Sequence, residues 1–181
     1  MTSIVLPQCI TEIANLLFYN CHNLSSFTIP KKIESIGYSA FHGCNKLTEI
    51  SIPDKVASIG NDAFWSYNLK TIKIEEQRTS LFEQMLCSAS NCEILYLPKT
   101  LKDIRVGSLP EYLRELHCPA IEPPTLYPNS NLNRNCKIYV PQQSVQKYRM
   151  AEGWKEFASN ITAIKEPDAG GSGHDFPWGE I

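Results

Sequence analysis

Long apolar runs are missing from this sequence of 181 residues: no stretch approaches the roughly 20 apolar residues that a membrane-spanning helix needs. A basic excess is missing as well, because 17 Lys and Arg residues stand against 19 Asp and Glu residues, for a net charge of -2. Proteins that bind nucleic acid normally carry a surplus or a stripe of basic residues. We therefore expect neither a membrane-spanning segment nor a nucleic-acid partner.

The motifs of the common enzyme classes are absent too, since the sequence has no HExxH, GxSxG, P-loop or GxGxxG. His117 and Cys118 are adjacent, but neighbours on a strand point to opposite faces and do not readily form a nucleophile pair. His22 and His42 fall at positions that we expect to be exposed turns. We expect no enzymatic activity, no metal site and no cofactor. The four histidines, none with metal-ligand spacing, are His22, His42, His117 and His174.

Cysteine is present, but not in a pattern that marks disulfides or zinc. The seven cysteines are an odd number, and no CxxC pair occurs. One interpretation is that the cysteines form a disulfide framework or a metal site. The other is that they are small buried residues used for packing. Their positions within the repeat described below favour packing. They are Cys9, Cys21, Cys44, Cys87, Cys92, Cys118 and Cys136.

The first twenty residues lack the basic start, the apolar centre and the small-residue cleavage site of a secretory signal peptide. Two alternatives follow from this. Either the protein is cytoplasmic, or the chain as given begins after processing.

What the sequence does contain is an internal repeat. An apolar residue followed by proline recurs in steps of 21 to 23 residues, with Glu75 in the one place where proline is missing. A period this regular predicts a solenoid, in which each unit buries its apolar face against the next. The prolines of the series are Pro7, Pro30, Pro53, Pro98, Pro119 and Pro141.

Aligned on this period, the repeats form apolar columns that predict a continuous core. Within one unit, "LTEISIP" alternates as a strand does, with Ile50 and Ile52 inward and Glu49 and Ser51 outward. The stretch "IGYSAFHGC" predicts a short helical or irregular return. The columns are Ile10, Ile33 and Val56; Ile13, Ile36 and Ile59; Phe18, Phe41 and Phe64; Leu24, Leu47 and Leu69; and Cys21 with Cys44.

These columns resemble the BspA-like leucine-rich repeats, whose unit runs approximately LP-x-x-V-x-x-IG-x-x-AF-x-x-C-x-x-L-x-x-I-x-IP. Residues 6–74 match it closely, whereas later units depart from it, with Leu86 in place of Phe and Cys92 in place of Leu. The resemblance implies an α/β solenoid, a right-handed leucine-rich repeat superhelix of about six 21–23-residue coils. Each coil would carry one short parallel strand, and a helical cap would follow at the C-terminal end.

The chain divides by composition into three parts: a solenoid over residues 1–143, a cap over 144–166 and a Gly-rich tail over 167–181. In the cap, Ser144 is expected to be the N-cap of a helix to Ala151, while Trp154 and Phe157 cover the last coil. The tail is expected to be disordered, with a short recognition segment at "HDFPWGEI" as the alternative.

The outward residues of successive strands should form columns across the sheet, and we select one of them as the candidate protein-binding site. Aromatic residues with polar groups beside them are common in protein-binding surfaces. The other interpretation is that Tyr and Thr simply favour strands. The candidate column is Thr28, Ser51, Lys73, Tyr96, His117 and Tyr139, beside a second column of Ser26, Glu49, Thr71, Ile94, Glu115 and Lys137.

BspA-like proteins are found largely on the surfaces of anaerobic bacteria and in some protozoa, and they are associated with adhesion. The resemblance therefore implies a non-enzymatic protein-binding module, in a bacterial cell-surface or secreted adhesin-type protein that contacts host matrix or cell-surface proteins. The alternatives are an intracellular interaction scaffold and a structural spacer within a larger repeat protein.

Overall fold

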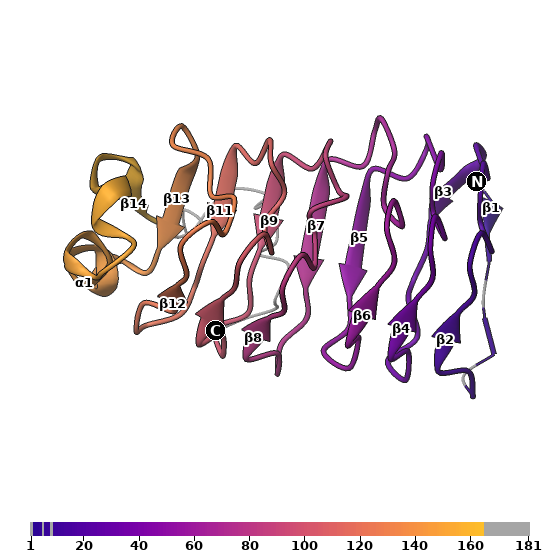
Figure 1. Ribbon diagram of the computed structural model, residues 1–181, viewed down its shortest axis with the longest axis horizontal. Helices are drawn as coiled ribbons and strands as arrows, with labels where there is room; N and C mark the ends of the chain where they lie inside the picture. The colour runs from indigo at the N-terminus through magenta and orange to yellow at the C-terminus, as the bar shows by residue number, and fades with distance from the viewer. Residues whose placement is uncertain (1, 5, 8, 165–181) are drawn as a thin grey trace, which may run out of the picture.

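The computed structural model describes residues 2–4, 6, 7 and 9–164, and these form a solenoid of about seven turns with little helix. Figure 1 shows the coils side by side along the long axis, with the helical cap at the orange end. The predicted solenoid is therefore confirmed. The predicted tail, residues 167–181, lies outside the described residues.

The main sheet has six parallel strands in the order β14-β13-β11-β9-β7-β5. Consecutive coils therefore contribute neighbouring strands, as the repeat predicts. Inward and outward residues alternate as expected, since Ile50 and Ile52 are buried whereas Glu49 is exposed. The strands are β5 Glu49–Ile52, β7 Thr71–Ile74, β9 Ile94–Tyr96, β11 Glu115–His117, β13 Lys137–Val140 and β14 Ile161–Ala163.

Each coil from the first to the sixth also carries a second strand, which the sequence analysis did not predict. These two-residue strands form two further parallel sheets, β2-β4-β6 and β12-β10-β8. The return between the short and the main strand is a run of turns rather than a helix. The short strands are β2 Glu12–Ile13, β4 Ser35–Ile36, β6 Ser58–Ile59, β8 Ser80–Leu81, β10 Asp103–Ile104 and β12 Thr125–Leu126.

At the N-terminal end the main strands are interrupted. Strand β3 (Leu24–Ser26) pairs with β1 (Thr2–Ser3) and has no ladder with β5 among the described residues. Phe27 stands where the next coils carry isoleucine, and its ring packs against Phe18 and Phe41, with centroids 4.8 and 5.1 Å away.

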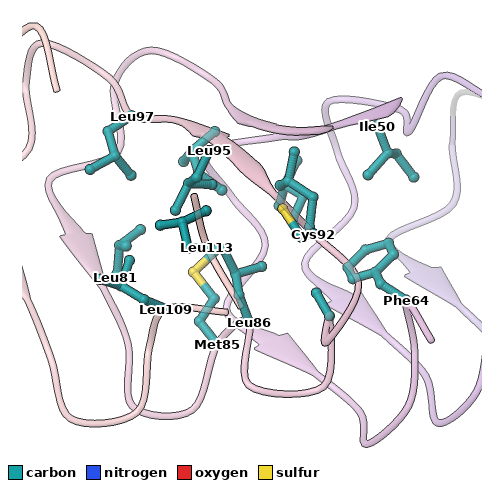
Figure 2. Close-up of a cluster of buried hydrophobic side chains, with 14 of the residues drawn as sticks. Ile50, Phe64, Leu81, Met85, Leu86, Cys92, Leu95, Leu97, Leu109 and Leu113 are labelled. Carbon is teal, nitrogen blue, oxygen red and sulfur yellow. The ribbon is translucent and has the colours of Figure 1, made fainter. Parts of the chain in front are cut away.

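The core is a stack of columns, as predicted. The rings of Phe18, Phe41 and Phe64 lie one above another, with centroids 5.1 and 5.6 Å apart. Where the repeat departs from its own pattern the positions are still buried: Leu86 and Cys92 are 0% and 1% exposed. Figure 2 shows these two side chains among the leucines of the following coils, so the core continues beyond the phenylalanines.

All seven cysteines are free thiols. Cys44, Cys92, Cys118 and Cys136 are buried, which confirms the packing interpretation for these four. Cys9 and Cys87 are exposed, so that interpretation is wrong for them. Both exposed cysteines lie within turns.

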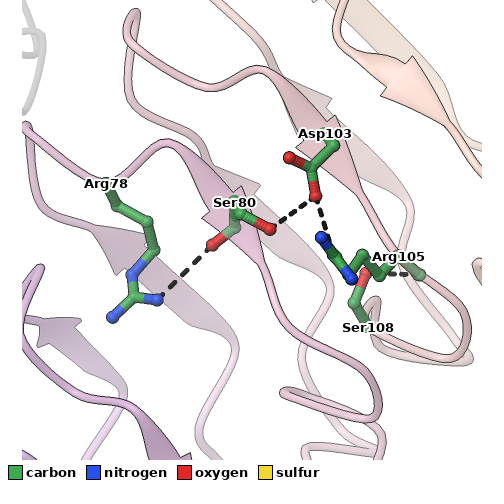
Figure 3. A network of polar contacts seen from close by, with 5 residues as sticks. All are labelled: Arg78, Ser80, Asp103, Arg105 and Ser108. Carbon is green, nitrogen blue, oxygen red and sulfur yellow. Dashed lines mark hydrogen bonds and ion pairs between the residues drawn. The ribbon is translucent and has the colours of Figure 1, made fainter.

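Arg78 occupies the column of Ile33 and Val56, in the coil where Glu75 replaces the proline. Its guanidinium is buried and donates to the backbone carbonyls of Asp54 at 2.6 Å, of Pro53 and Ser80 at 3.4 Å, and of Val56. Figure 3 shows the polar chain that continues from it, in which the Ser80 hydroxyl donates to Asp103. A buried cation is therefore held by carbonyl dipoles of two coils, which satisfies most of its donors.

The C-terminal cap contains η1 (Gln142–Ser144), α1 (Val145–Met150) and η2 (Lys155–Asn160). Ser144 is the N-cap residue of α1, as predicted, but its side chain makes no capping hydrogen bond. Its backbone is already helical (φ -101°, ψ -9°), and its buried hydroxyl donates instead to the Ile121 carbonyl at 2.8 Å. The hydroxyl thus ties the cap to the last coils. None of the helices in the described part of the chain is long and apolar enough to cross a membrane.

Two aromatic residues seal the last coil. Trp154 is fully buried, donates from Nε1 to the Pro124 carbonyl at 2.7 Å and meets Tyr148 edge-on at 5.0 Å between centroids. This confirms its structural role. After η2 the chain forms β14, which pairs with β13 and adds a strand that the sequence analysis did not predict.

Candidate protein-binding surface

The strand-face column, defined here as Ser51, Lys73, Tyr96, His117 and Tyr139, comes from consecutive main strands. Each member is the register partner of the next across β5, β7, β9, β11 and β13, so the predicted column exists. Thr162 of β14 continues it beyond Tyr139. Thr28 is not brought into the column, because it lies beyond the end of β3 and outside the six-stranded sheet.

Three of these residues, Tyr96, His117 and Tyr139, form a stack that we call the strand ladder. The His117 ring lies between the two tyrosine rings, with centroids 4.4 Å from Tyr96 and 4.6 Å from Tyr139. All three side chains are half-buried. The stack results from the register itself, since neighbouring parallel strands lie about 4.8 Å apart. The sheet therefore presents a preorganised aromatic stripe.

The groups around the strand ladder set its electrostatics. Burial lowers the pKa of His117, while Glu115, whose carboxylate is 3.5 Å from His117 Nε2, opposes this shift. Neither ring nitrogen of His117 has a hydrogen-bond partner among the described residues. Burial also raises the pKa of Tyr96 and of Tyr139, with Glu115 adding to both shifts. At neutral pH the ladder is thus an uncharged stripe with a carboxylate beside it.

Ion pairs surround the aromatic stripe. Lys73 Nζ lies 3.3 Å from Glu49 Oε2. Lys73 belongs to the candidate column and Glu49 to the column that the sequence analysis placed beside it. At the start of the strands, Glu93 is shared by Lys70 at 2.7 Å and Arg114 at 3.5 Å. Exposed pairs of this kind contribute little stability, on the order of 0–1 kcal/mol each. On this face the ion pairs hold the charged side chains in defined positions.

A second aromatic stack was missed by the sequence analysis. Tyr19, His42 and Trp65 stack with centroids 5.0 and 4.6 Å apart, and Tyr67 meets Trp65 edge-on at 4.9 Å. His42, expected in an exposed turn, is half-buried within this stack. The signal was present in the alignment, because Tyr19, His42 and Trp65 each follow a phenylalanine of the core column. We call these four residues the turn ladder.

The buried thiols are poor nucleophiles. Burial raises the pKa of Cys44, Cys92 and Cys136 to about 12 and that of Cys118 to about 11. Because the thiolate is the reactive form, these cysteines are structural. His117 and Cys118 point to opposite faces, since the Cys118 thiol lies 3.3 Å from the Tyr148 hydroxyl inside the cap. Over the residues that the structure describes, no group of three or more His, Cys, Asp or Glu residues is arranged to hold a metal.

The coils stack so that their parallel strands cover a core of Leu, Ile and Phe, and outward residues form columns on the sheet. This architecture is that of a leucine-rich repeat solenoid. The model of the BspA type leucine rich repeat region matches residues 1–118 in six copies. The chain therefore belongs to the BspA-type leucine-rich repeat family. The comparison with curated proteins found no match.

Two solved structures share the fold. The leucine-rich repeat protein TpLRR of T. pallidum is 26% identical with a TM-score of 0.52, over 76% of this chain and 68% of that one. The pneumococcal vaccine antigen PcpA is 18% identical with a TM-score of 0.59, over 91% of this chain. This chain covers 41% of the PcpA chain, so it spans less than half of that protein's length.

Proposed function

We propose that this protein is a non-enzymatic protein-binding module of a bacterial cell-surface or secreted protein, with an adhesin-type role. Its partners would be host matrix or cell-surface proteins, bound through the strand-face column. The observation that carries the proposal is the strand ladder, three stacked and half-buried rings held by strand register. Rigid aromatic rings supply contact area with little loss of side-chain freedom, which is why they dominate binding surfaces.

Membership of the BspA-type family supports the protein-binding part of this proposal. The description of PcpA as a vaccine antigen supports the surface location by analogy. A scaffold inside the cell is the second candidate, and the seven free thiols favour it, because disulfides form and persist in oxidising compartments.

The test is a binding panel of immobilised host matrix proteins, run beside a pull-down from bacterial lysate. The strand variant is Tyr96→Ala with Tyr139→Ala, which removes both outer rings of the ladder. The matched control is Tyr38→Ala with Tyr112→Ala, since these two tyrosines are 50% and 59% exposed and lie outside the main sheet. Circular dichroism establishes that both variants are folded.

Saturable binding to a matrix protein, weakened at least about tenfold in the strand variant and unchanged in the control, is the expected result. Matrix binding that survives the strand variant would move the site off the sheet. A specific lysate partner together with no matrix binding would favour the scaffold instead.

A further inference from the structure

Cys21 and Cys44 occupy the same column in the first two coils, 23 positions apart. The turns that carry them make the same backbone hydrogen bonds. The Cys21 N–H donates to the Phe18 carbonyl at 3.1 Å, and the Cys44 N–H donates at 3.2 Å to the carbonyl of Phe41, the equivalent residue of the second coil. Because the local backbone is the same, the two cysteine side chains leave it in the same direction, one coil above the other.

The two turns lie close enough for a disulfide. Asn20 N–H, one residue before the first cysteine, donates to the His42 carbonyl of the second coil at 2.8 Å. The rings of Tyr19 and His42 have centroids 5.0 Å apart. Disulfides join residues whose Cα atoms are about 4.4–6.8 Å apart and whose Cβ atoms are about 3.8 Å apart, so closure draws the turns together by about 1 Å. Neither cysteine belongs to a strand, so this movement leaves the sheet register unchanged.

The Cys44 thiol is directed at the first coil. Its Sγ donates to the Phe18 carbonyl at 3.2 Å, and this is the same carbonyl that accepts from the Cys21 N–H. Cys44 is 0% exposed. Burial raises the pKa of Cys44 to about 12, and the charge of a Cys21 thiolate adds to this shift. The two thiols are therefore electrostatic neighbours, and Cys44 is the one that reacts poorly with dissolved reagents.

Cys21 is the accessible member of the pair. It is partly exposed, and it lines a surface pocket of about 280 Å³ together with Ile4 and His22. A dissolved oxidant therefore reaches the Cys21 thiol before it reaches that of Cys44. This pairing of an accessible thiol with a buried one directed toward it gives the two cysteines different parts in one reaction.

We propose that Cys21 and Cys44 form a redox site, which closes to a disulfide between the first two coils when the protein meets a small disulfide such as oxidised glutathione. The Cys21 thiolate attacks one glutathione sulfur, forms a mixed disulfide and releases one glutathione thiolate, which takes up a proton. Cys44 then gives up its proton and attacks the Cys21 sulfur, which releases the second glutathione. Two protein thiols are oxidised, and one small disulfide is reduced to two thiols.

The second step takes place within one molecule, so the position of Cys44 beside the mixed disulfide offsets its low reactivity. Once the Cys21 sulfur is bonded to glutathione it carries no charge, and its contribution to the raised pKa of Cys44 is lost. The new bond closes a loop of 22 intervening residues and fixes the first coil to the second. In an oxidising compartment this end of the solenoid is cross-linked, whereas in a reducing one both thiols stay free. The site does not depend on the proposed binding function.

The test is incubation of the whole folded protein in glutathione buffers of increasing oxidised fraction, followed by alkylation of the remaining thiols and tryptic mass mapping. Trypsin places Cys21 in residues 1–31 and Cys44 in residues 33–46. We expect these two peptides to become joined, with two fewer thiols alkylated. Cys9 lies in the same peptide as Cys21, so Cys9→Ser is the matched control and should keep the cross-link. Cys21→Ser should abolish it.

Hydrogen exchange supplies a second readout. Asn20 N–H bonds across the two coils, so its exchange should slow at least about fivefold on oxidation in the natural protein and not at all in Cys21→Ser. Cys21 that stays bound to glutathione, or a cross-link through Cys9 in place of Cys21, would overturn the proposal. A cross-link that forms only in urea would also overturn it, since the bond would then belong to the unfolded chain.

Discussion

At the scale of single residues, the aromatic rings do two separate jobs in this protein. Phe41 lies in the core, between Phe18 and Phe64, and is 0% exposed. Tyr96 and Tyr139 lie on the outer face of the main sheet, in later coils, and are half-buried. The position of a ring within the repeat unit decides whether it packs in the core or lies on the surface. Inward positions recur at one place in each unit, and outward positions recur at another.

Phe41→Ala should lower the free energy of unfolding by about 3–5 kcal/mol, because it removes the middle ring of a stack and leaves a cavity. Urea denaturation measures this. The exposed neighbour Tyr38 offers the control, and Tyr38→Ala should cost about 0.5 kcal/mol or less. A loss below about 1 kcal/mol for Phe41→Ala would mean that the column does not form the core.

His117 should make stability depend on pH in the mildly acid range. Because burial lowers its pKa in the folded state, the unfolded chain binds more protons once the pH falls below about 6.5. The free energy of unfolding should therefore decrease as the pH falls from 7.5 to 5.5. His117→Phe keeps a ring between the tyrosines and should flatten this dependence in urea unfolding. An unchanged slope would show that His117 is protonated equally in both states.

At the scale of elements, the packing of the C-terminal cap against the last coil depends on one backbone position, Gly153. Gly153 lies between α1 and η2 with φ +79°, a conformation that residues with side chains rarely adopt. A Cβ at this position would lie 2.8 Å from the Leu126 carbonyl oxygen and 3.2 Å from Leu126 Cβ. The glycine thus lets the cap approach the last coil closely.

Gly153→Ala should lower the free energy of unfolding by about 1–3 kcal/mol through backbone strain and the contact with Leu126. The matched variant is Glu152→Ala, one residue earlier and exposed, which should change stability by about 0.5 kcal/mol or less. Both are measured by urea unfolding followed by tryptophan fluorescence. If Gly153→Ala were as stable as the natural protein, the cap would not be seated against Leu126.

Elements differed in how well the sequence predicted them. Strands β5, β7, β9, β11 and β13 of the main sheet could be predicted, because each has three or four alternating residues before its proline or the position equivalent to it. The short strands, such as Ser35–Ile36, have two residues, too few to show a period. Ser144 could be predicted as the N-cap residue of α1, but the partner of its hydroxyl, the Ile121 carbonyl, lies far away in the sequence and could not. Strand β14 depends likewise on its pairing with β13.

At the scale of the whole molecule, the repeat converts a local pattern into long columns. Strand register aligns Tyr96, His117 and Tyr139 although 43 positions separate the first from the last in the sequence. The column could be predicted because a fixed period gives the alignment. The stacking of the rings and the unpartnered nitrogens of His117 could not, since they depend on side-chain orientation within the folded coils. The turn ladder had a signal in the alignment, because Tyr19, His42 and Trp65 each follow a phenylalanine of the core column.

The central claim is that partners bind on the strand face, and hydroxyl-radical footprinting of the complex tests it most directly. The sample is the protein with the matrix partner captured on the panel, and the readout is oxidation of individual tyrosines. The account predicts at least about threefold slower oxidation of Tyr96 and Tyr139 in the complex, with Tyr38 and Tyr112 unchanged. Unchanged oxidation of Tyr96 and Tyr139, with protection at other residues, would contradict it.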